Sequence, residues 1–409
     1  MAWYNVDAME LSFFNKRKQN EVLSVLIDIG SASVGASLVR IEKDKTPHIL
    51  ASVREDISFQ EVLSSARFLF AMNNALEKVL KEIQTSIGKI DLNLEHSKTV
   101  SHVFCTLSSP WFILKTRTLD IVREKEFDVT ERAIEEFIDK DIEILKDEMK
   151  EILPPKDVRI IEKKILQIKL NGYEIKNPYK QKTARVEMST AIGVSSGKVT
   201  KSIERKINNF FHVSSIHFGT FPVAAFSAIR DIFPIEKNFL FLDITGESTD
   251  VSLVENDLII GTISFPLGKN FFIREISTRL NTIHEEAMTL FVMFLRSELH
   301  DEQSTQIAGT VADSEKEWLA RFEKAIATIA QKGVLPHKIF FTTDSDVMPL
   351  FSGSIKKAKS DLLADTSFDP QYIDQLIVSK FVSFGTGVTR DPFIVIETLL
   401  AEKVLGQHI

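Results

Sequence analysis

The chain has 409 residues, of which 44% are hydrophobic and 26% are charged, and its formal net charge is −7. These values are ordinary for a globular protein and exclude overall disorder, a collagen-like chain and a continuous coiled coil. At roughly 150 residues per domain the length predicts two or three domains, and the acidic balance leaves no basic excess for general nucleic-acid binding.

The first twenty residues predict an N-terminal extension. Aromatic residues from Trp3 to Phe14 precede the basic triplet Lys16–Lys18, which is the reverse of the order in a secretory signal. The sequence contains no run of about 18 apolar residues, so it predicts no transmembrane helix. We expect a cytoplasmic protein with a flexible terminus; the alternative is that Trp3–Lys18 makes peripheral contact with an anionic membrane at the inner face of the cell membrane.

The first folded segment predicts a β-hairpin followed by a helix. Residues 23–29 predict a buried strand, Gly30–Gly35 a turn of small residues, and Ala36–Ile41 the second strand. Apolar residues then recur at helical spacing over 61–86.

Residues 99–195 differ in character and predict a small α+β unit inserted into a larger domain. Pro154 and Pro155 end a charged helix expected at about 130–152, and Asn171-Gly172 predicts a tight turn. The strands expected in this unit cover residues 99–107, 112–121, 160–170, 173–175 and 183–194.

From residue 198 strands and helices alternate again, so the expected fold class is α/β. The expected strands cover residues 213–220, 238–244, 251–254, 257–265 and 338–343. The expected helices cover residues 198–211, 222–231, 269–299, 313–332, 347–358 and 392–404, with a polar connection at 300–312.

Two of the hairpins share one pattern. Asp28–Gly35 and Asp243–Asp250 each begin with Asp-Ile at the end of an apolar strand and continue into a small polar tip. Backbone N–H groups at such a tip can cradle phosphates, and Gly allows close approach. Asp28 and Asp243 are suited to hold the water ligands of Mg²⁺. One such hairpin is commonly structural, but two copies about 215 residues apart predict a duplicated fold with a cleft between its halves.

The sequence resembles the actin-like ATPase superfamily over residues 21–405. Asp28–Gly35 is similar to its first phosphate motif, Asp243–Asp250 to its second, and residues 338–355 to its adenosine motif. The resemblance implies a two-lobed, duplicated ribonuclease-H-like fold that holds ATP and magnesium between the lobes, with Asp28 and Asp243 nearest the metal. The binding residues that it implies are Asp28, Gly30, Ser31, Ala32, Ser33, Asp243, Thr245, Gly246, Glu247, Ser248, Thr249, Thr343, Asp344 and Ser345.

Within this superfamily the chain resembles the cell-division protein FtsA, and the pilus protein PilM is the alternative. The block 99–195 has the position and size of the 1C domain inserted into the first lobe of FtsA, and Gly172–Met188 resembles the stretch that ends this domain. Pro266–Gly268 and Thr282–Ala287 resemble FtsA after its second phosphate loop.

This resemblance implies a division into domains. We expect the N-terminal extension at 1–20, lobe I at 21–98, the inserted 1C-type domain at 99–195, lobe I again at 196–236, lobe II at 237–270, its helical subdomain at 271–337, lobe II again at 338–380, and a segment closing lobe I at 381–409.

Several departures from the superfamily pattern affect the nucleotide. The chain has only 16 Gly beside 30 Phe, and Gly is missing where the superfamily uses it. Thr245 and Glu247 flank a single Gly246 in the second phosphate motif, and a carboxylate near a triphosphate is repelled unless it points away or meets the metal. Thr343-Asp344-Ser345 replaces a Gly pair.

A further departure concerns catalysis. The superfamily usually has Glu-Pro-x-Ala-Ala where this chain has Phe221-Pro222-Val-Ala-Ala, so the acid that polarises water is replaced by Phe. Phosphoryl transfer depends on positioning and electrostatics. We therefore expect weak or no ATP and Mg²⁺ binding and no efficient hydrolysis.

We expect a scaffold that binds protein partners and self-associates. An FtsA-like chain would bind the C-terminal tail of an FtsZ-like partner at the membrane; no amphipathic membrane helix of the FtsA kind follows 392–404 in this sequence. A PilM-like chain would bind a short N-terminal peptide of an inner-membrane pilus protein. The alternative is an enzyme, a sugar or acetate kinase, against which Phe221 and the insertion argue.

Residues of other reactive types predict no further site. The nine His lack metal-ligand spacing, and Ser108-Ser109 lacks the context of a hydrolase nucleophile. The lone Cys105 excludes an intramolecular disulfide and a Cys-based zinc site, and its apolar surroundings predict a buried structural thiol.

Overall fold

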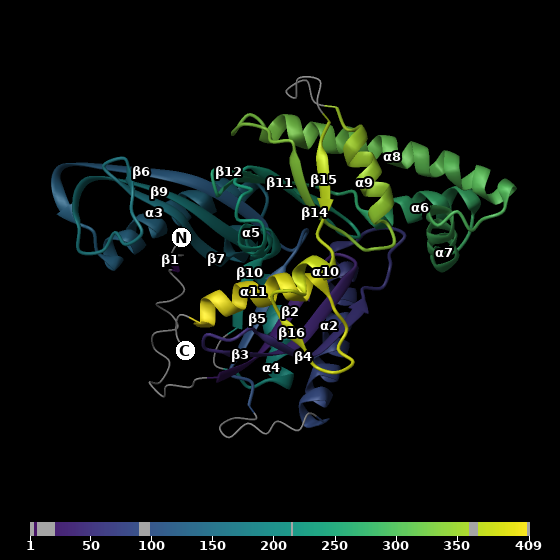
Figure 1. The fold of residues 1–409 in the computed structure, drawn as a ribbon, viewed down its shortest axis with the longest axis horizontal. Coiled ribbons are helices and arrows are strands. Elements are labelled where there is room, and N and C mark those ends of the chain that lie inside the picture. Colours follow the sequence, from purple (N-terminus) through teal and green to yellow (C-terminus); the bar gives the residue numbers. More distant parts are fainter. Residues whose placement is uncertain (1–3, 6–20, 90–98, 214–215, 360–366, 407–409) are drawn as a thin grey trace.

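The computed structural model describes residues 4–5, 21–89, 99–213, 216–359 and 367–406. Their strands form three sheets: one in each of two lobes, and a third in a unit that extends from the first lobe (Figure 1). The two-lobed α/β architecture with an inserted α+β unit is therefore confirmed.

The sheet of lobe I contains six strands in the order β10-β5-β2-β3-β4-β16. Every residue of β2 after Glu21 is buried, as expected for a strand with covered faces. The strands are β2 (Glu21–Ile29), β3 (Ser33–Glu42), β4 (His48–Asp56), β5 (His102–Leu107), β10 (Ile216–Thr220) and β16 (Ser383–Phe384). The helices of this lobe are α2 (Ser65–Lys89), α4 (Gly197–Phe210), α5 (Phe221–Ile232) and α11 (Pro392–Gly406).

The sheet of lobe II repeats this topology. Its order, β13-β12-β11-β14-β15, matches β4-β3-β2-β5-β10 of lobe I, because in each sheet two antiparallel hairpin partners lie on one side of the first strand and two parallel strands on the other. The strands are β11 (Phe239–Ile244), β12 (Thr249–Glu255), β13 (Leu258–Phe265), β14 (Lys338–Thr342) and β15 (Asp369–Tyr372). The fold is duplicated, as the paired hairpins predict.

The helices of lobe II correct two expectations. Residues 269–299 form two helices rather than one, because Asn281 adopts a left-handed conformation with φ of 50° and caps the first, which Asn tolerates well. The polar stretch 300–312 is not a connection but the first part of a 29-residue helix. The helices are α6 (Lys269–Leu280), α7 (His284–Leu295), α8 (Asp301–Ile329) and α9 (Met348–Lys357), and the short α10 (Gln375–Val378) that follows packs against α11 of lobe I.

The third sheet belongs to the inserted unit and is covered by α3 (Glu131–Glu148). Thr130 caps this helix by accepting a hydrogen bond from the Ala133 amide. Ile134, Phe137, Ile138, Ile142 and Leu145 are buried, as their spacing predicts. The strands are β6 (Ile113–Asp128), β7 (Val158–Leu170), β8 (Tyr173–Glu174) and β9 (Lys182–Ser196), with β1 (Tyr4–Asn5) paired to β7; two 3₁₀ turns cover Met149–Glu151 and Pro155–Asp157.

Phenylalanine forms much of the interior. Apart from Trp318, the largest fully buried side chains of the described residues are all Phe. The high Phe content therefore has a packing role, because each such ring removes a large apolar area from water.

Candidate functional site

The tips of the two related hairpins face each other at the junction of the lobes. The Ser31 hydroxyl lies 2.7 Å from the Thr245 hydroxyl, and the Glu247 amide donates to Ser31 Oγ at 2.8 Å. A Cβ placed on Gly246 would lie 2.6 Å from the Cβ of Ala32. The two tips are thus in direct contact, with Gly246 required for the close approach.

The residues beside each tip are held within the fold. Trp111 Nε1 donates to the Gly30 carbonyl at 2.7 Å. Ser248 Oγ donates to the Ser109 carbonyl at 3.0 Å, and Thr249 Oγ1 donates to the Leu267 carbonyl at 2.7 Å.

Asp28, the expected metal-facing residue of lobe I, is paired with an arginine. Arg54 Nη2 donates to Asp28 Oδ2 at 2.7 Å, its Nη1 donates to Ser33 Oγ at 2.8 Å, and its Nε donates to Asp391 Oδ2 at 2.7 Å. Burial raises the pKa of Asp28, against the lowering effect of Arg54. The side chain therefore faces a protein cation.

The Glu247 carboxylate binds donors on α6 of lobe II. Its Oε1 accepts from Asn270 Nδ2 at 2.7 Å and from Arg274 Nη1 at 3.0 Å, and Arg274 Nη2 binds its other oxygen. Glu247 is only 5% exposed. A fork of this kind satisfies a buried carboxylate and resolves the repulsion expected from its place in the phosphate motif.

The third expected loop follows β14 and is also engaged. Asp344 forms an ion pair with Lys269 at the start of α6, and Tyr372 donates its hydroxyl to the Thr343 carbonyl at 3.0 Å. Thr343 is buried, whereas Ser345 is exposed. Burial, together with the charge of Asp344, raises the pKa of Tyr372 to about 12.

Further acids lie buried beneath the tips. Asp243 accepts from Thr342 Oγ1 at 2.8 Å and Asp250 from Ser109 Oγ at 2.6 Å, and the second oxygen of each carboxyl has no hydrogen-bond partner within the described part of the chain. Burial raises the pKa of Asp243, with Asp250 adding to the shift, and burial also raises the pKa of Asp250. Burial and the nearby Asp28 raise the pKa of Glu397, which lies in α11. Burial therefore disfavours the charged form of each of these acids relative to water.

Phe221 is the residue for which the resemblance to the superfamily predicts an acid. Its side chain is fully buried, with ring centroids 6.2 Å from Phe241 and 5.5 Å from Phe393. It serves the packing between the lobes, and no polar group at this position can orient water.

These contacts do not fit a magnesium-bound triphosphate between the hairpin tips. The tips touch where phosphates would be cradled, Asp28 is bonded to Arg54, and Glu247 already fills the donors of Asn270 and Arg274. Among the described residues, no group of three or more His, Cys, Asp or Glu is arranged to hold a metal ion.

Sequence reasoning missed the cations of this site. Arg54 lies in β4, which was not expected as a strand, and Arg274 lies on a helix without any local motif. Glu397 carried a detectable signal, because it is a single acid within the strongly apolar run from Phe393 to Leu400. A buried acid in such a helix indicates a polar environment behind it.

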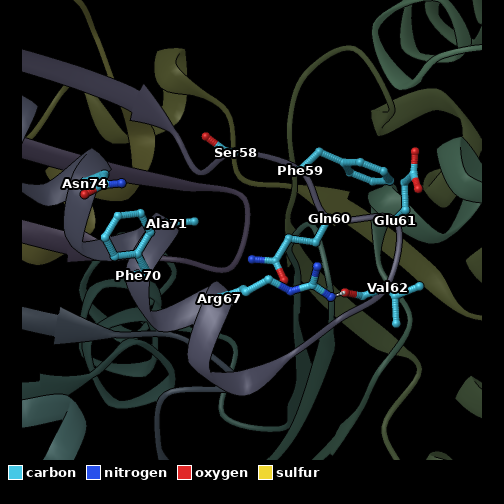
Figure 2. A pocket seen from close by; sticks show the side chains of 9 residues that line it. All are labelled: Ser58, Phe59, Gln60, Glu61, Val62, Arg67, Phe70, Ala71 and Asn74. Carbon is cyan, nitrogen blue, oxygen red and sulfur yellow. Dashed lines mark hydrogen bonds between the residues drawn. The ribbon is translucent and has the colours of Figure 1, made fainter.

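A cavity of about 530 Å³ lies beside this site, at the connection from β4 to α2. Figure 2 shows Phe59 and Glu61 on one side of it and Phe70, Ala71 and Asn74 of α2 on the other. Phe70 is 68% exposed. A second cavity, of about 360 Å³, lies between β6 and β13.

One expectation from the sequence concerns the membrane. No helix among the described residues has the length and apolar character needed to cross a membrane. Residues Trp3 and 6–20, which contain most of the expected membrane-contact segment, lie outside the described residues.

Cys105 is buried, as expected, and burial raises its thiol pKa well above the ordinary value.

Comparisons with family models and with curated protein sequences find no match for this chain. Among solved structures, a PilM–PilN type IV pilus biogenesis complex aligns with a TM-score of 0.63 and 14% identity, covering 93% of this chain and 98% of the other. The ethanolamine utilization protein EutJ of Carboxydothermus hydrogenoformans aligns at 0.43 and 12%, covering 97% and 95%.

A Bacteroides thetaiotaomicron protein, described as having an actin-like ATPase fold and unknown function, aligns with a TM-score of 0.40 and 9% identity, covering 94% of this chain and 99% of the other. At these identities the likenesses concern the fold alone, and the argument rests on the first alignment and on the duplicated sheet topology described above. The chain therefore has the two-lobed fold of the actin-like ATPases.

Proposed function

We propose that this chain is an actin-fold scaffold of the PilM kind, which binds a short segment of a membrane protein at the cytoplasmic face of a membrane. The observation that supports this most is the alignment over nearly the full length of both chains with a solved PilM–PilN complex. It favours the pilus alternative over the FtsA-like role that sequence reasoning put first.

The state of the cleft supports a binding role over an enzymatic one. In this proposal the nucleotide-site residues have structural roles: Thr245 and Ser248 join the lobes, while Asp28 and Asp243 are bonded within their own lobes. Phe221 supplies no acid for hydrolysis, and the touching tips leave the cleft closed. We also propose the domain division given above, with the inserted unit at 99–195 as a partner-binding module.

Peptide binding to the full chain tests this proposal. Two fluorescent peptides are compared by polarisation: the N-terminal cytoplasmic segment of an inner-membrane pilus protein and the C-terminal tail of FtsZ, each with a scrambled control. We expect saturable binding of the pilus peptide only. Binding of the FtsZ tail alone would establish the FtsA-like role, with self-association then measured by sedimentation, and binding of neither would rule out both scaffold assignments.

Turnover of ATP tests the remaining alternative. Kinases typically turn over at about 1–100 per second. We expect no release of ADP by the full chain in that range with Mg-ATP and a panel of sugars or acetate. Turnover above about 1 per second would replace the scaffold with an enzyme.

A further inference from the structure

The side chain of Glu247 is placed at the point where the two lobes meet. Its own backbone amide donates to Ser31 of lobe I at 2.8 Å, while its carboxylate is directed into lobe II. The residue is 5% exposed, so its charge must be compensated within the protein.

The compensation comes from donors that also suit a phosphate group. Arg274 binds both carboxylate oxygens and Asn270 adds a hydrogen bond to one of them, all from consecutive turns of α6. A guanidinium fork recognises carboxylate and phosphate by the same geometry. The chain therefore supplies its own anion to a set of anion-binding side chains.

Arg274 also contacts residues of lobe I. Its Nη1 lies 3.4 Å from the Gln60 carbonyl, and its guanidinium lies 5.4 Å from the centre of the Phe59 ring. Phe59 in turn stacks on His284 of α7, with ring centroids 3.4 Å apart. Figure 2 shows the segment that bears Phe59 and Gln60 as it runs from β4 toward α2.

The carboxylate thus fixes an arginine that touches the opposite lobe. Without the carboxylate, Arg274 would lose both of its bonds to Glu247 and with them the support for its contacts to Gln60 and Phe59. The same hairpin tip also contacts lobe I directly, through Thr245 and Ser31.

We propose that Glu247 is a built-in anionic ligand, whose carboxylate occupies the Arg274–Asn270 anion site and holds the two lobes closed without a nucleotide. This inference concerns closure alone and does not depend on which partner the scaffold binds.

Distance measurement between the lobes tests closure. Spin labels at Lys81→Cys on α2 and Glu317→Cys on α8 occupy exposed positions in opposite lobes, and the native Cys105 is buried and should not react. We expect a narrow distance distribution that Mg-ATP does not change. Glu247→Gln, which keeps the shape and removes the charge, should broaden it and shift it to longer distances.

The matched control is Glu275→Gln, which removes an acid from an exposed position on the same helix. It should retain the distribution of the unmodified chain. Arg274→Lys, which keeps the charge but loses the fork, should broaden the distribution as Glu247→Gln does. An unchanged distribution in both Glu247→Gln and Arg274→Lys would overturn the proposal.

A second measurement asks whether the site accepts an external anion once its own is removed. Glu247→Gly leaves Arg274 and Asn270 without their carboxylate. Inorganic pyrophosphate at millimolar concentration should raise the Tm of this variant and not that of the unmodified chain, because a ligand stabilises the state that binds it. A pyrophosphate-induced Tm rise in the unmodified chain, or its absence in Glu247→Gly, would contradict an anion site filled by Glu247.

Discussion

Individual charges near the cleft are compensated by specific partners, and Glu397 is an exception in this respect. Arg54 lies between Asp28 and Asp391, whereas Glu397 is 3% exposed and, among the described residues, has no hydrogen-bond partner of good geometry beyond a weak contribution from the Thr106 side chain. Burial is the main cause that raises the pKa of Glu397, followed by the nearby Asp28. A group whose pKa is raised on folding makes stability depend on pH.

The direction of this dependence follows from proton binding. An unfolded Glu ionises near pH 4.3, while the folded chain retains the proton to higher pH because its pKa is raised. The folded state then binds more protons, so the free energy of unfolding falls as pH rises above that value toward the folded pKa.

Substituting Glu397→Gln should reduce this loss of stability. We expect the free energy of unfolding, from urea titrations at pH 5, 7 and 9, to fall less with pH than in the unmodified chain. The difference at pH 9 should reach about 1–3 kcal/mol, the range for an unsatisfied buried polar group. Glu82→Gln, at an exposed position of α2, is the control; equal pH dependence in the unmodified chain and Glu397→Gln would refute the prediction.

At the scale of elements, β7 of the inserted unit is bonded to the end of β10 in lobe I. Glu162 is 3% exposed, and its Oε2 accepts from the Thr220 amide at 3.1 Å and from the Thr220 hydroxyl at 2.6 Å. These bonds lie immediately before α5, so they also fix the start of that helix.

Removing this carboxylate should loosen the junction between the two elements. Glu162→Ala leaves the Thr220 donors without this acceptor, which should cost about 1–3 kcal/mol and raise amide hydrogen exchange in β7 and β10. Glu174→Ala on β8, whose exposed side chain accepts a hydrogen bond from Gln167 Nε2 at 3.0 Å, should leave exchange at this junction unchanged. Equal exchange in the two variants would show that Glu162 is not what holds β7 to β10.

How far sequence predicts elements depends on their environment. β2 and β11 are buried apolar runs that end at small polar tips, and this local pattern identified both. β4 could not be identified in the same way, because most of its residues are only partly buried and their apolar spacing is irregular. The break between α6 and α7 depends on the left-handed conformation of Asn281, which the sequence permits but does not require.

At the scale of the whole molecule, the lobes share an aromatic junction around Phe221. This ring is fully buried on α5 and contacts Phe241 of lobe II and Phe393 of α11. Because residues from both lobes pack here, a cavity at this position weakens the association of the lobes as well as the local core.

We expect Phe221→Ala to lower the free energy of unfolding by about 3–5 kcal/mol, the usual range for loss of a buried Phe. Urea unfolding followed by tryptophan fluorescence measures this loss. Phe70→Ala, at a site 68% exposed, should change stability by less than about 0.5 kcal/mol. A comparable effect of both substitutions would contradict a central packing role for Phe221.

The cleft shows what sequence cannot supply at this scale. The repeated hairpins predicted a duplicated fold and identified tip residues that do meet, namely Ser31 and Thr245. Their partners could not be predicted, because Arg54 and Arg274 come from separate elements that reach Asp28 and Glu247 only when each lobe has folded. Long-range ion pairs of this kind have no local sequence pattern.

The pairing of charges at the hairpin tips restricts the mutational routes open to this chain. Replacing Arg54 alone would leave Asp28 and Asp391 without their shared cation, and replacing Glu247 alone would leave Arg274 without its carboxylate partner. Since losing one member of a buried pair commonly costs about 3–5 kcal/mol, a stepwise change to an open phosphate cradle would pass through poorly folded intermediates. Coordinated double substitutions would avoid that barrier. The closed cleft is therefore hard to open by single substitutions.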